Sequence, residues 1–291
     1  MLVYLNGKFV PAADASISAF DRGFIFGDGV YEVWRVIRGQ LFEAGRHQAR
    51  LERGLRELRI SPPPESSIKG IFAIAERLLG ENDLLDREAT LYVEITRGAA
   101  PRTHFFPPVG TVPTLLVMAS PFTPSDARFK GTAVITQPDI RWLRCDIKTI
   151  QLLPNVLARQ AATEAGASEA IFVRDGVLTE GTHTTVCGVV DGVLRTHPAN
   201  HLVLPGVTRE VVLDLVSTLG VRVVEEAITL AELGRAEELF LTGTTTDVTP
   251  IVAVDRRPVA HGAPGPIARA LLERLLDRMA AAARPRLTVI A

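Results

Sequence analysis

The order in which strand-like and helix-like patterns follow one another constrains the fold of this chain most strongly. In the first 120 residues, two helical patterns lie between strand patterns. The first strand pattern contains Asn6-Gly7, which is typical of a tight turn between two strands. These residues therefore predict a small N-terminal α/β domain. We expect strands over 30–37, 91–96 and 114–119, and helices over 44–60 and 67–80.

The second half of the chain is richer in strand patterns, with Asp-Gly turns at 175 and 191. Its strands and helices do not alternate one by one, so the pattern favours an α+β fold with a mixed or antiparallel sheet over repeated βαβ units. We expect strands near 132–137, 140–150, 169–174, 177–190, 193–196 and 238–241, and helices over 155–165, 207–219, 229–233 and 266–283.

A length of 291 residues suggests two domains, at roughly 150 residues each. The stretch around 121–130 contains two prolines and serine and has little apolar periodicity, as is typical of a linker. We therefore expect a small domain over 1–120, an interdomain linker over 121–130 and a larger domain over 131–291.

Composition excludes several classes of protein. The 32 Lys and Arg residues balance 33 Asp and Glu residues, so the net charge of −1 gives no global attraction to nucleic acid or anionic membrane. The two cysteines, Cys145 and Cys187, cannot form a disulfide scaffold and favour a reducing compartment. The chain shows neither a secretory signal nor an apolar run of about 18 residues. We expect a cytoplasmic protein without nucleic-acid or membrane partners.

Lysine is rare here, which draws attention to Lys148, one of only four. It follows a β-like run from Asp139 that is rich in arginine. Burial and cationic neighbours can lower the pKa of a lysine, whose free amine then forms a Schiff base with a carbonyl. The alternative is an edge-strand lysine that faces water.

Two segments suit an anion. Residues 204–210 open a helix with Gly206 and Thr208, where free amides and a hydroxyl can bind a phosphate dianion, and 242–246 form a hydroxyl-rich turn after a strand. Arg102 and His104 are two residues apart and would clamp a carboxylate if their loop is extended. The alternatives are an ordinary helix cap and a solvated loop.

Glu180 ends a strand pattern in apolar surroundings, where its carboxylate could pair with a cationic ring nitrogen or simply be an exposed turn acid. Tyr31 lies on the opposite strand face from Glu32 and could donate to a ligand or pack in the core. His197 and His201 flank Pro198 without companion ligands, so no metal site is expected.

Taken together, these segments resemble the class IV, or fold type IV, pyridoxal-phosphate aminotransferases, most closely their bacterial D-amino acid group. The resemblance extends over nearly the whole chain, with many separated motifs in the same order. Its motifs lie at 21–33, 96–98, 101–104, 139–153, 179–181, 196–200, 206–209, 244–246 and 249–250.

The resemblance implies a two-domain fold whose larger domain, a mixed-sheet pseudo-barrel, binds pyridoxal 5'-phosphate. Lys148 matches the Schiff-base lysine, which is also the proton shuttle, and Glu180 matches the acid that faces the pyridine nitrogen. The matching phosphate-binding residues are Arg50, Val207, Thr208 and Thr244. The matching carboxylate-binding residues are Tyr31, Arg102 and His104, of which Arg102 and His104 reach in from the neighbouring subunit, so that a homodimer is implied.

The implied activity is ping-pong transamination of D-amino acids such as D-alanine and D-glutamate with 2-oxo acids such as 2-oxoglutarate. Two departures bear on it: His183 interrupts the usual serine run and borders the substrate or the cofactor's 3-oxygen, and Leu153 stands where branched-chain enzymes generally have tyrosine. Branched-chain L-amino acid or (R)-amine transamination and aminodeoxychorismate lyase activity remain alternatives on the same fold. A non-enzymatic binding protein is a further alternative, against which Lys148 and Glu180 speak together.

Overall fold

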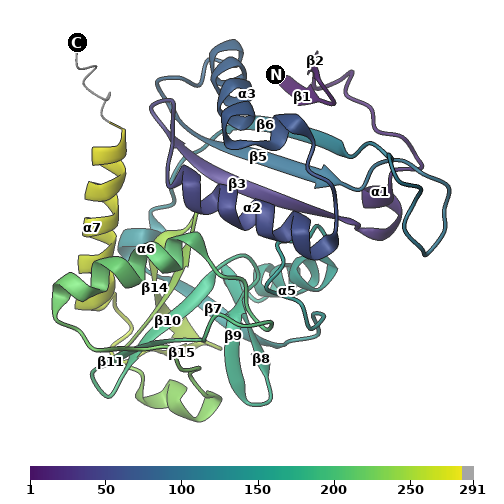
Figure 1. Ribbon diagram of the computed structural model, residues 1–291. Helices are drawn as coiled ribbons and strands as arrows, with labels where there is room; N and C mark the ends of the chain where they lie inside the picture. Colours follow the sequence, from purple (N-terminus) through teal and green to yellow (C-terminus); the bar gives the residue numbers. More distant parts are fainter. Residues whose placement is uncertain (284–291) are drawn as a thin grey trace. The chain divides into compact units, whose positions relative to one another are not determined.

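The computed structural model describes residues 1–283 (Figure 1) and divides into two compact units. Unit 1 comprises Met1–Thr123, Ile147–Gln151 and the described part of Arg278–Ala291, and unit 2 comprises Pro124–Asp146 and Leu152–Asp277. Lys148 therefore belongs to unit 1, although most of the residues around it in sequence belong to unit 2. The predicted linker over 121–130 and the boundaries beside it stay a prediction.

Unit 1 contains a six-stranded sheet in the order β2-β1-β6-β5-β3-β4, and each neighbouring pair is antiparallel. Asn6 and Gly7 both have positive φ, as a tight hairpin turn requires, so the predicted turn is confirmed. The strands are β1 (Leu2–Leu5), β2 (Lys8–Pro11), β3 (Gly29–Ile37), β4 (Gln40–Leu41), β5 (Glu88–Thr96) and β6 (Thr114–Pro121).

Helices α2 (Ala44–Leu58) and α3 (Ile68–Glu81) pack on one face of this sheet, and both were predicted (Figure 1). Their buried leucines and isoleucines pack with alternate residues of β3 and β5 in one core. These buried positions follow the helical and strand periodicities on which the predictions were based. The short helix α1 (Arg22–Phe26) was not predicted. Asp21 caps it by accepting a hydrogen bond from the Gly23 amide at 2.8 Å.

Unit 2 contains a nine-stranded mixed sheet in the order β12-β11-β10-β13-β14-β7-β8-β9, with β15 beside β14. The pairs β11–β12, β14–β7 and β7–β8 are parallel and the others antiparallel, so the predicted α+β class with a mixed sheet is confirmed. The strands are β7 (Thr132–Pro138), β8 (Glu169–Arg174), β9 (Val177–Gly181), β10 (Thr185–Val190), β11 (Val193–Thr196), β12 (Val223–Val224), β13 (Glu238–Gly243), β14 (Asp247–Val254) and β15 (Arg257–Pro258).

The predicted helices of the second half are present as α5 (Leu153–Glu164), α6 (Val207–Val216) and α7 (Pro266–Ala282). The one expected at 229–233 is a 3-10 helix, Leu230–Arg235, which begins with a capping box between Thr229 and Glu232. The remaining helices are η1 (Pro64–Ser66), α4 (Ala127–Lys130) and η2 (Ser217–Leu219). Within residues 1–283, no helix is both long and apolar enough to span a membrane.

Two strand predictions were wrong. The pattern at 177–190 breaks at 182–184 into β9 and β10, and the pattern at 140–150 forms no strand. In the segment at 140–150, the backbone forms hydrogen bonds with different parts of the chain. The Cys145 amide donates to the His201 carbonyl at 2.9 Å, and the Lys148 carbonyl accepts from the Tyr31 amide at 3.0 Å. A strand requires one continuous neighbour, which local alternation of side chains cannot supply.

Candidate active site

Lys148 is held beside Tyr31 in unit 1. The Tyr31 amide donates to the Lys148 carbonyl, and the Lys148 Nζ lies 4.2 Å from the centroid of the Tyr31 ring. Ile147 and Thr149 on either side are buried, and Thr149 Oγ1 donates to the Gly29 carbonyl at 3.0 Å. The chain at Lys148 and directly after it is therefore bonded to β3, while the lysine amine rests on the aromatic face of Tyr31 in a cation–π contact.

Arg50 is fixed by a buried carboxylate on the other face of β3. Glu32 is 0% exposed and accepts from Arg50 Nε at 2.9 Å and Nη2 at 2.8 Å, while His47 Nδ1 lies 3.0 Å from its Oε1. Although burial alone would raise it, Arg50 and His47 hold the pKa of Glu32 far below its ordinary value. Burial lowers the pKa of His47. The guanidinium expected to bind phosphate thus has a set orientation.

Arg102 and His104 lie in the exposed loop between β5 and β6. Both contact the ring of Phe26: the Arg102 guanidinium lies 5.4 Å from its centroid, and the His104 ring lies 5.8 Å away. The two side chains expected to form a carboxylate clamp are therefore brought to one aromatic side chain, and both remain exposed on their own chain.

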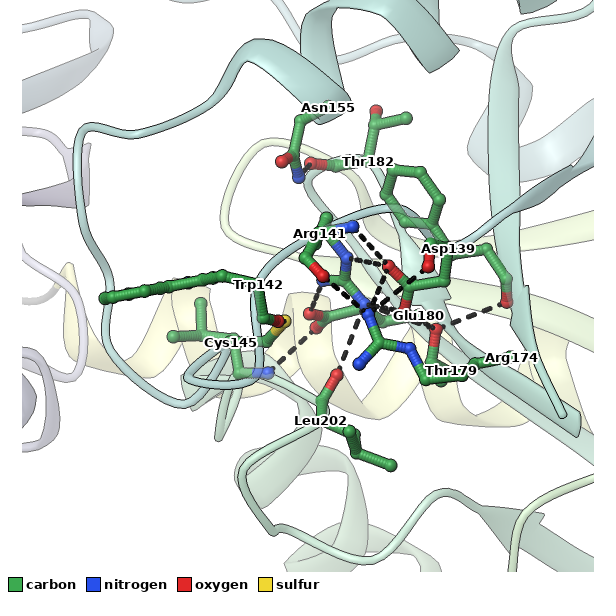
Figure 2. A network of polar contacts seen from close by, with 12 residues as sticks. Asp139, Arg141, Trp142, Cys145, Asn155, Arg174, Thr179, Glu180, Thr182 and Leu202 are labelled. Atoms are coloured by element: carbon green, nitrogen blue, oxygen red, sulfur yellow. Dashed lines mark hydrogen bonds and ion pairs between the residues drawn. The ribbon is translucent and has the colours of Figure 1, made fainter. Parts of the chain in front are cut away.

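Glu180 forms the centre of a second group of charges, in unit 2. It lies buried on β9, where Arg141 Nη1 donates to its Oε1 and the Leu204 amide donates to its Oε2 at 3.0 Å. Figure 2 shows Arg141 lying between Glu180 and Asp139, with Arg141 Nη2 2.8 Å from Asp139 Oδ2. Burial raises the pKa of Glu180 against the opposing effect of Arg141. A cationic partner placed at this carboxylate would favour its ionised form.

The other face of Arg141 is fixed in turn by Asp139. Thr179 Oγ1 donates to Asp139 Oδ2 at 3.0 Å, and Arg174 Nη2 lies 3.0 Å from Oδ1 (Figure 2). Although burial raises it, the hydrogen bonds and charge of Arg141 lower the pKa of Asp139 overall. Arg141 is thus locked between two carboxylates, and Glu180 receives one cation in a defined position.

His183 lies in the break between β9 and β10, over the buried carboxylate of Glu169. Its Nδ1 is 2.9 Å from Glu169 Oε2, and its side chain is 46% exposed. Glu169 also accepts from the Thr182 hydroxyl at 2.5 Å and amide at 3.2 Å, and from the Thr184 hydroxyl at 3.1 Å. The 182–184 segment is therefore folded around one carboxylate, and the imidazole is bound to it through Nδ1.

The start of α6 has the donor set that a phosphate requires. Gly206 is its N-cap and provides no side-chain cap, Val207 and Thr208 are buried, and a Cβ on Gly206 would lie 2.7 Å from Thr185 Oγ1. The hydroxyl of Thr242, the β13 partner of Thr185, is buried and has no hydrogen-bond partner among the described residues. First-turn amides with threonine hydroxyls around a glycine fit a phosphate dianion.

Thr244 follows β13 in the next turn and is half-buried. Within unit 2, the sequence-predicted residues Val207, Thr208 and Thr244 thus stand at a helix start and at a strand end. Within unit 1, Lys148 and Tyr31 are in direct contact.

Three residues that organise these groups were missed in sequence. Arg141 was noted only as part of an arginine-rich run, Glu32 only as the neighbour of Tyr31, and Glu169 not at all. His47 and Arg50 are three residues apart and therefore share one helix face. This spacing, together with an acidic residue in a strand predicted to be buried, could have predicted that Glu32 pairs with them. No local pattern marks Glu169, because its partners at 182–184 are more than ten residues away.

Comparison with known proteins agrees with this chemistry. The sequence profile of the family described as amino-transferase class IV matches residues 29–254. D-alanine aminotransferase of Bacillus licheniformis is 39% identical over 92% of this chain and 94% of its own.

Solved structures give the same fold. A branched-chain amino acid aminotransferase from Escherichia coli has a TM-score of 0.88 at 22% identity, covering 99% of this chain and 97% of that one. A hypothetical aminotransferase from Mycobacterium tuberculosis, in its PLP-bound form, has a TM-score of 0.83 at 24% identity, covering 97% and 99%. The chain therefore belongs to the class IV aminotransferases and is a pyridoxal-phosphate-dependent enzyme similar to the D-alanine aminotransferases.

Proposed function

We propose that this enzyme transfers the amino group of D-amino acids, D-alanine and D-glutamate among them, to 2-oxo acids such as 2-oxoglutarate in a ping-pong reaction. The observation that carries the proposal is the contact between Lys148 and Tyr31, the amine resting 4.2 Å from the ring centroid. It joins the expected reacting amine to one of the expected substrate-binding residues. The likeness to D-alanine aminotransferases over 92% of the chain supports the D-enantiomer.

Pyridoxal phosphate supplies an aldehyde that condenses with amines and a protonated ring that draws electrons away from the substrate's Cα. The Lys148 amine would hold that group, and its Nζ would carry the proton that leaves the substrate's Cα, acting as general base and then general acid. The bonds from the Lys148 carbonyl and the Thr149 hydroxyl to β3 limit the motion of the amine during this transfer.

Glu180 holds the proton on the pyridine nitrogen. Its carboxylate is oriented from two sides, by Arg141 and by the Leu204 amide, and burial excludes water that would weaken the pairing. Burial raises the pKa of Glu180, and Arg141 opposes that rise by favouring the ionised carboxylate.

Arg50, the amides of Val207 and Thr208, and Thr244 bind the phosphate. Glu32 fixes the Arg50 guanidinium by two hydrogen bonds, which lowers the entropy lost when the phosphate is bound. At the start of α6, backbone amides and threonine hydroxyls bind the phosphate dianion as uncharged donors.

Tyr31, Arg102 and His104 bind the substrate carboxylate, with Arg102 and His104 contributed by the second subunit of a homodimer. The exposure of both side chains in the loop between β5 and β6 supports this arrangement, because such groups can reach a neighbouring chain. His183 borders the substrate or the cofactor's 3-oxygen. Glu169 fixes its Nδ1, so the rest of the ring is available for that contact.

The test is a panel of paired enantiomers. Purified holoenzyme is given D- or L-alanine, glutamate or leucine with 2-oxoglutarate or pyruvate as acceptor, and the 2-oxo acid products are quantified. We expect turnover of the D-enantiomers. Turnover of L-leucine without D-alanine would contradict the proposal and favour the branched-chain reaction, and pyruvate release from aminodeoxychorismate would favour the lyase.

The role of Lys148 is tested by Lys148→Ala. Borohydride treatment of the wild-type holoenzyme should leave a phosphopyridoxyl group on the peptide that contains Lys148, detected by mass spectrometry. The variant should keep its circular dichroism spectrum and lose both the label and turnover. Sedimentation velocity of the wild type tests the homodimer, and a monomer that retains full activity would contradict the roles of Arg102 and His104.

A further inference from the structure

The pairing of β3 with β5 places an acidic residue on the same face of the sheet as Tyr31. In this register Tyr31 lies directly opposite Glu94, and Val33 opposite Tyr92. Because alternate strand residues share a face, these four side chains project from one side of the sheet. Glu32 projects from the other side, into the core with α2.

Direct contacts connect this face to Lys148. The rings of Tyr31 and Tyr92 are stacked, with centroids 5.7 Å apart and an interplanar angle of 30°. The Tyr92 hydroxyl donates to Glu94 Oε2 at 2.5 Å. Lys148 Nζ, Tyr31, Tyr92 and Glu94 thus form a continuous series of contacts that ends in a carboxylate.

The phenol of Tyr92 stays protonated in this series. Its burial and its hydrogen bond to Glu94 raise the pKa of Tyr92 far above its ordinary value. Tyr92 therefore acts as a donor that fixes the direction of the Glu94 carboxylate and adds no charge of its own.

No cation neutralises Glu94 among residues 1–283: its one polar side-chain partner there is the Tyr92 hydroxyl, and its cross-strand neighbours are Tyr31 and Leu116. The contrast with Glu32 is direct, since the Arg50 guanidinium offsets that carboxylate on the other face of the same sheet. Glu94 is half-buried, so solvent screens its charge less than that of a surface acid.

We propose that Glu94, oriented by Tyr92, is a specificity-determining residue that favours monocarboxylic amino acids and 2-oxo acids over dicarboxylic ones. The inference rests on the proposed function, which brings the substrate to Lys148 and Tyr31. Every amino acid carries an α-carboxylate there, so discrimination arises from a second carboxylate on the side chain. At a separation of about 8 Å, repulsion between two carboxylates changes relative affinity between about twofold and about thirtyfold, depending on the local dielectric.

The test compares wild type with Glu94→Gln, which removes the charge and keeps an acceptor for Tyr92. The measured quantity is the ratio of kcat/KM for D-glutamate to that for D-alanine, from single-turnover half-reactions of the holoenzyme. We expect this ratio to rise about tenfold in the variant, within the range that Coulomb's law allows. Glu76→Gln removes the same charge from the exposed surface of α3 and should leave the ratio at its wild-type value.

Two further measurements separate charge from structure. Tyr92→Phe keeps the negative charge, so its ratio should change much less than that of Glu94→Gln. In the wild type, raising the ionic strength should raise the ratio, whereas in Glu94→Gln it should not. An unchanged ratio in Glu94→Gln overturns the proposal; if that variant does not fold, a wild-type ratio independent of ionic strength overturns it.

Failure of the proposed function would be seen separately. If the wild type uses L-amino acids instead, the D-specificity is wrong, and the same ratio measured with L-glutamate and L-alanine still decides the role of Glu94.

Discussion

Replacing Glu169 by glutamine should destabilise the protein at neutral pH and remove a pH dependence. Glu169 is 1% exposed and accepts from Thr182 and Thr184 as well as from the Ala170 amide at 2.9 Å. Although burial opposes them, His183 and these donors lower the pKa of Glu169 to about 2 from 4.5. A glutamine has one acceptor oxygen and turns its own NH2 group toward donors, so part of this set loses its partner.

The magnitude follows from linkage between ionisation and folding. A carboxyl group whose pKa is lower in the folded state stabilises that state above the unfolded pKa, and the contribution disappears as pH falls through the folded pKa. For Glu169 the interval runs from 4.5 down to about 2, which corresponds to about 3 kcal/mol. For a chain of 291 residues, that is a decrease in Tm of about 5 °C.

The assay is thermal unfolding followed by circular dichroism at a series of pH values. Wild type and Glu169→Gln should differ in Tm by about 5 °C near pH 7, and the difference should shrink as pH falls below 4.5 toward 2. Glu164→Gln changes an exposed acid on α5 and should behave as wild type. A Tm difference that stays constant over this pH range would refute the reasoning, because the effect would then not come from ionisation of Glu169.

Three other changes test separate contacts. Gly98→Ala should cost about 3 kcal/mol or more in the free energy of unfolding measured in urea, because φ is +89° and the new Cβ would lie 2.0 Å from the Val112 carbonyl oxygen. Gly7→Ala, at φ +86° with nothing within 4 Å, should cost about 1 kcal/mol, and equal losses would contradict the steric explanation. Glu32→Gln should cost about 3 kcal/mol by leaving the Arg50 charge without its buried carboxylate, and an unchanged urea midpoint would argue against that pairing. Arg141→Met should raise the pKa of Glu180 further, so the pH at which cofactor fluorescence reports half-maximal binding should move upward, and a downward or absent shift would contradict the role of Arg141.

Much of the local structure could be predicted from the sequence. Helices α2, α3, α5 and α6 follow apolar spacing that the chain itself displays, and the turn at Asn6-Gly7 follows from residues that tolerate positive φ. The strand predicted at 140–150 was wrong, because alternating side chains do not reveal whether a neighbouring strand is present to pair with this segment.

The candidate site divides in the same way. Lys148 and Glu180 could be singled out because rare or acidic residues in motif contexts narrow the possible chemistry, and their roles stay predictions. The partners Arg141, Glu32 and Tyr92 could not be assigned to them, since each contact depends on strand register or on a loop returning from elsewhere in the chain.

Sequence by itself thus determined which residue types are available for amino-group chemistry and the periodicities that build the helices and most strands. Tertiary structure decided which charges are compensated: Glu180 by Arg141, Glu32 by Arg50, and Glu94 by no cation within the described residues. The physical reason is that hydrophobic periodicity is a local property of the chain, whereas the electrostatic environment of a carboxylate is set by groups that only folding brings within a few ångströms.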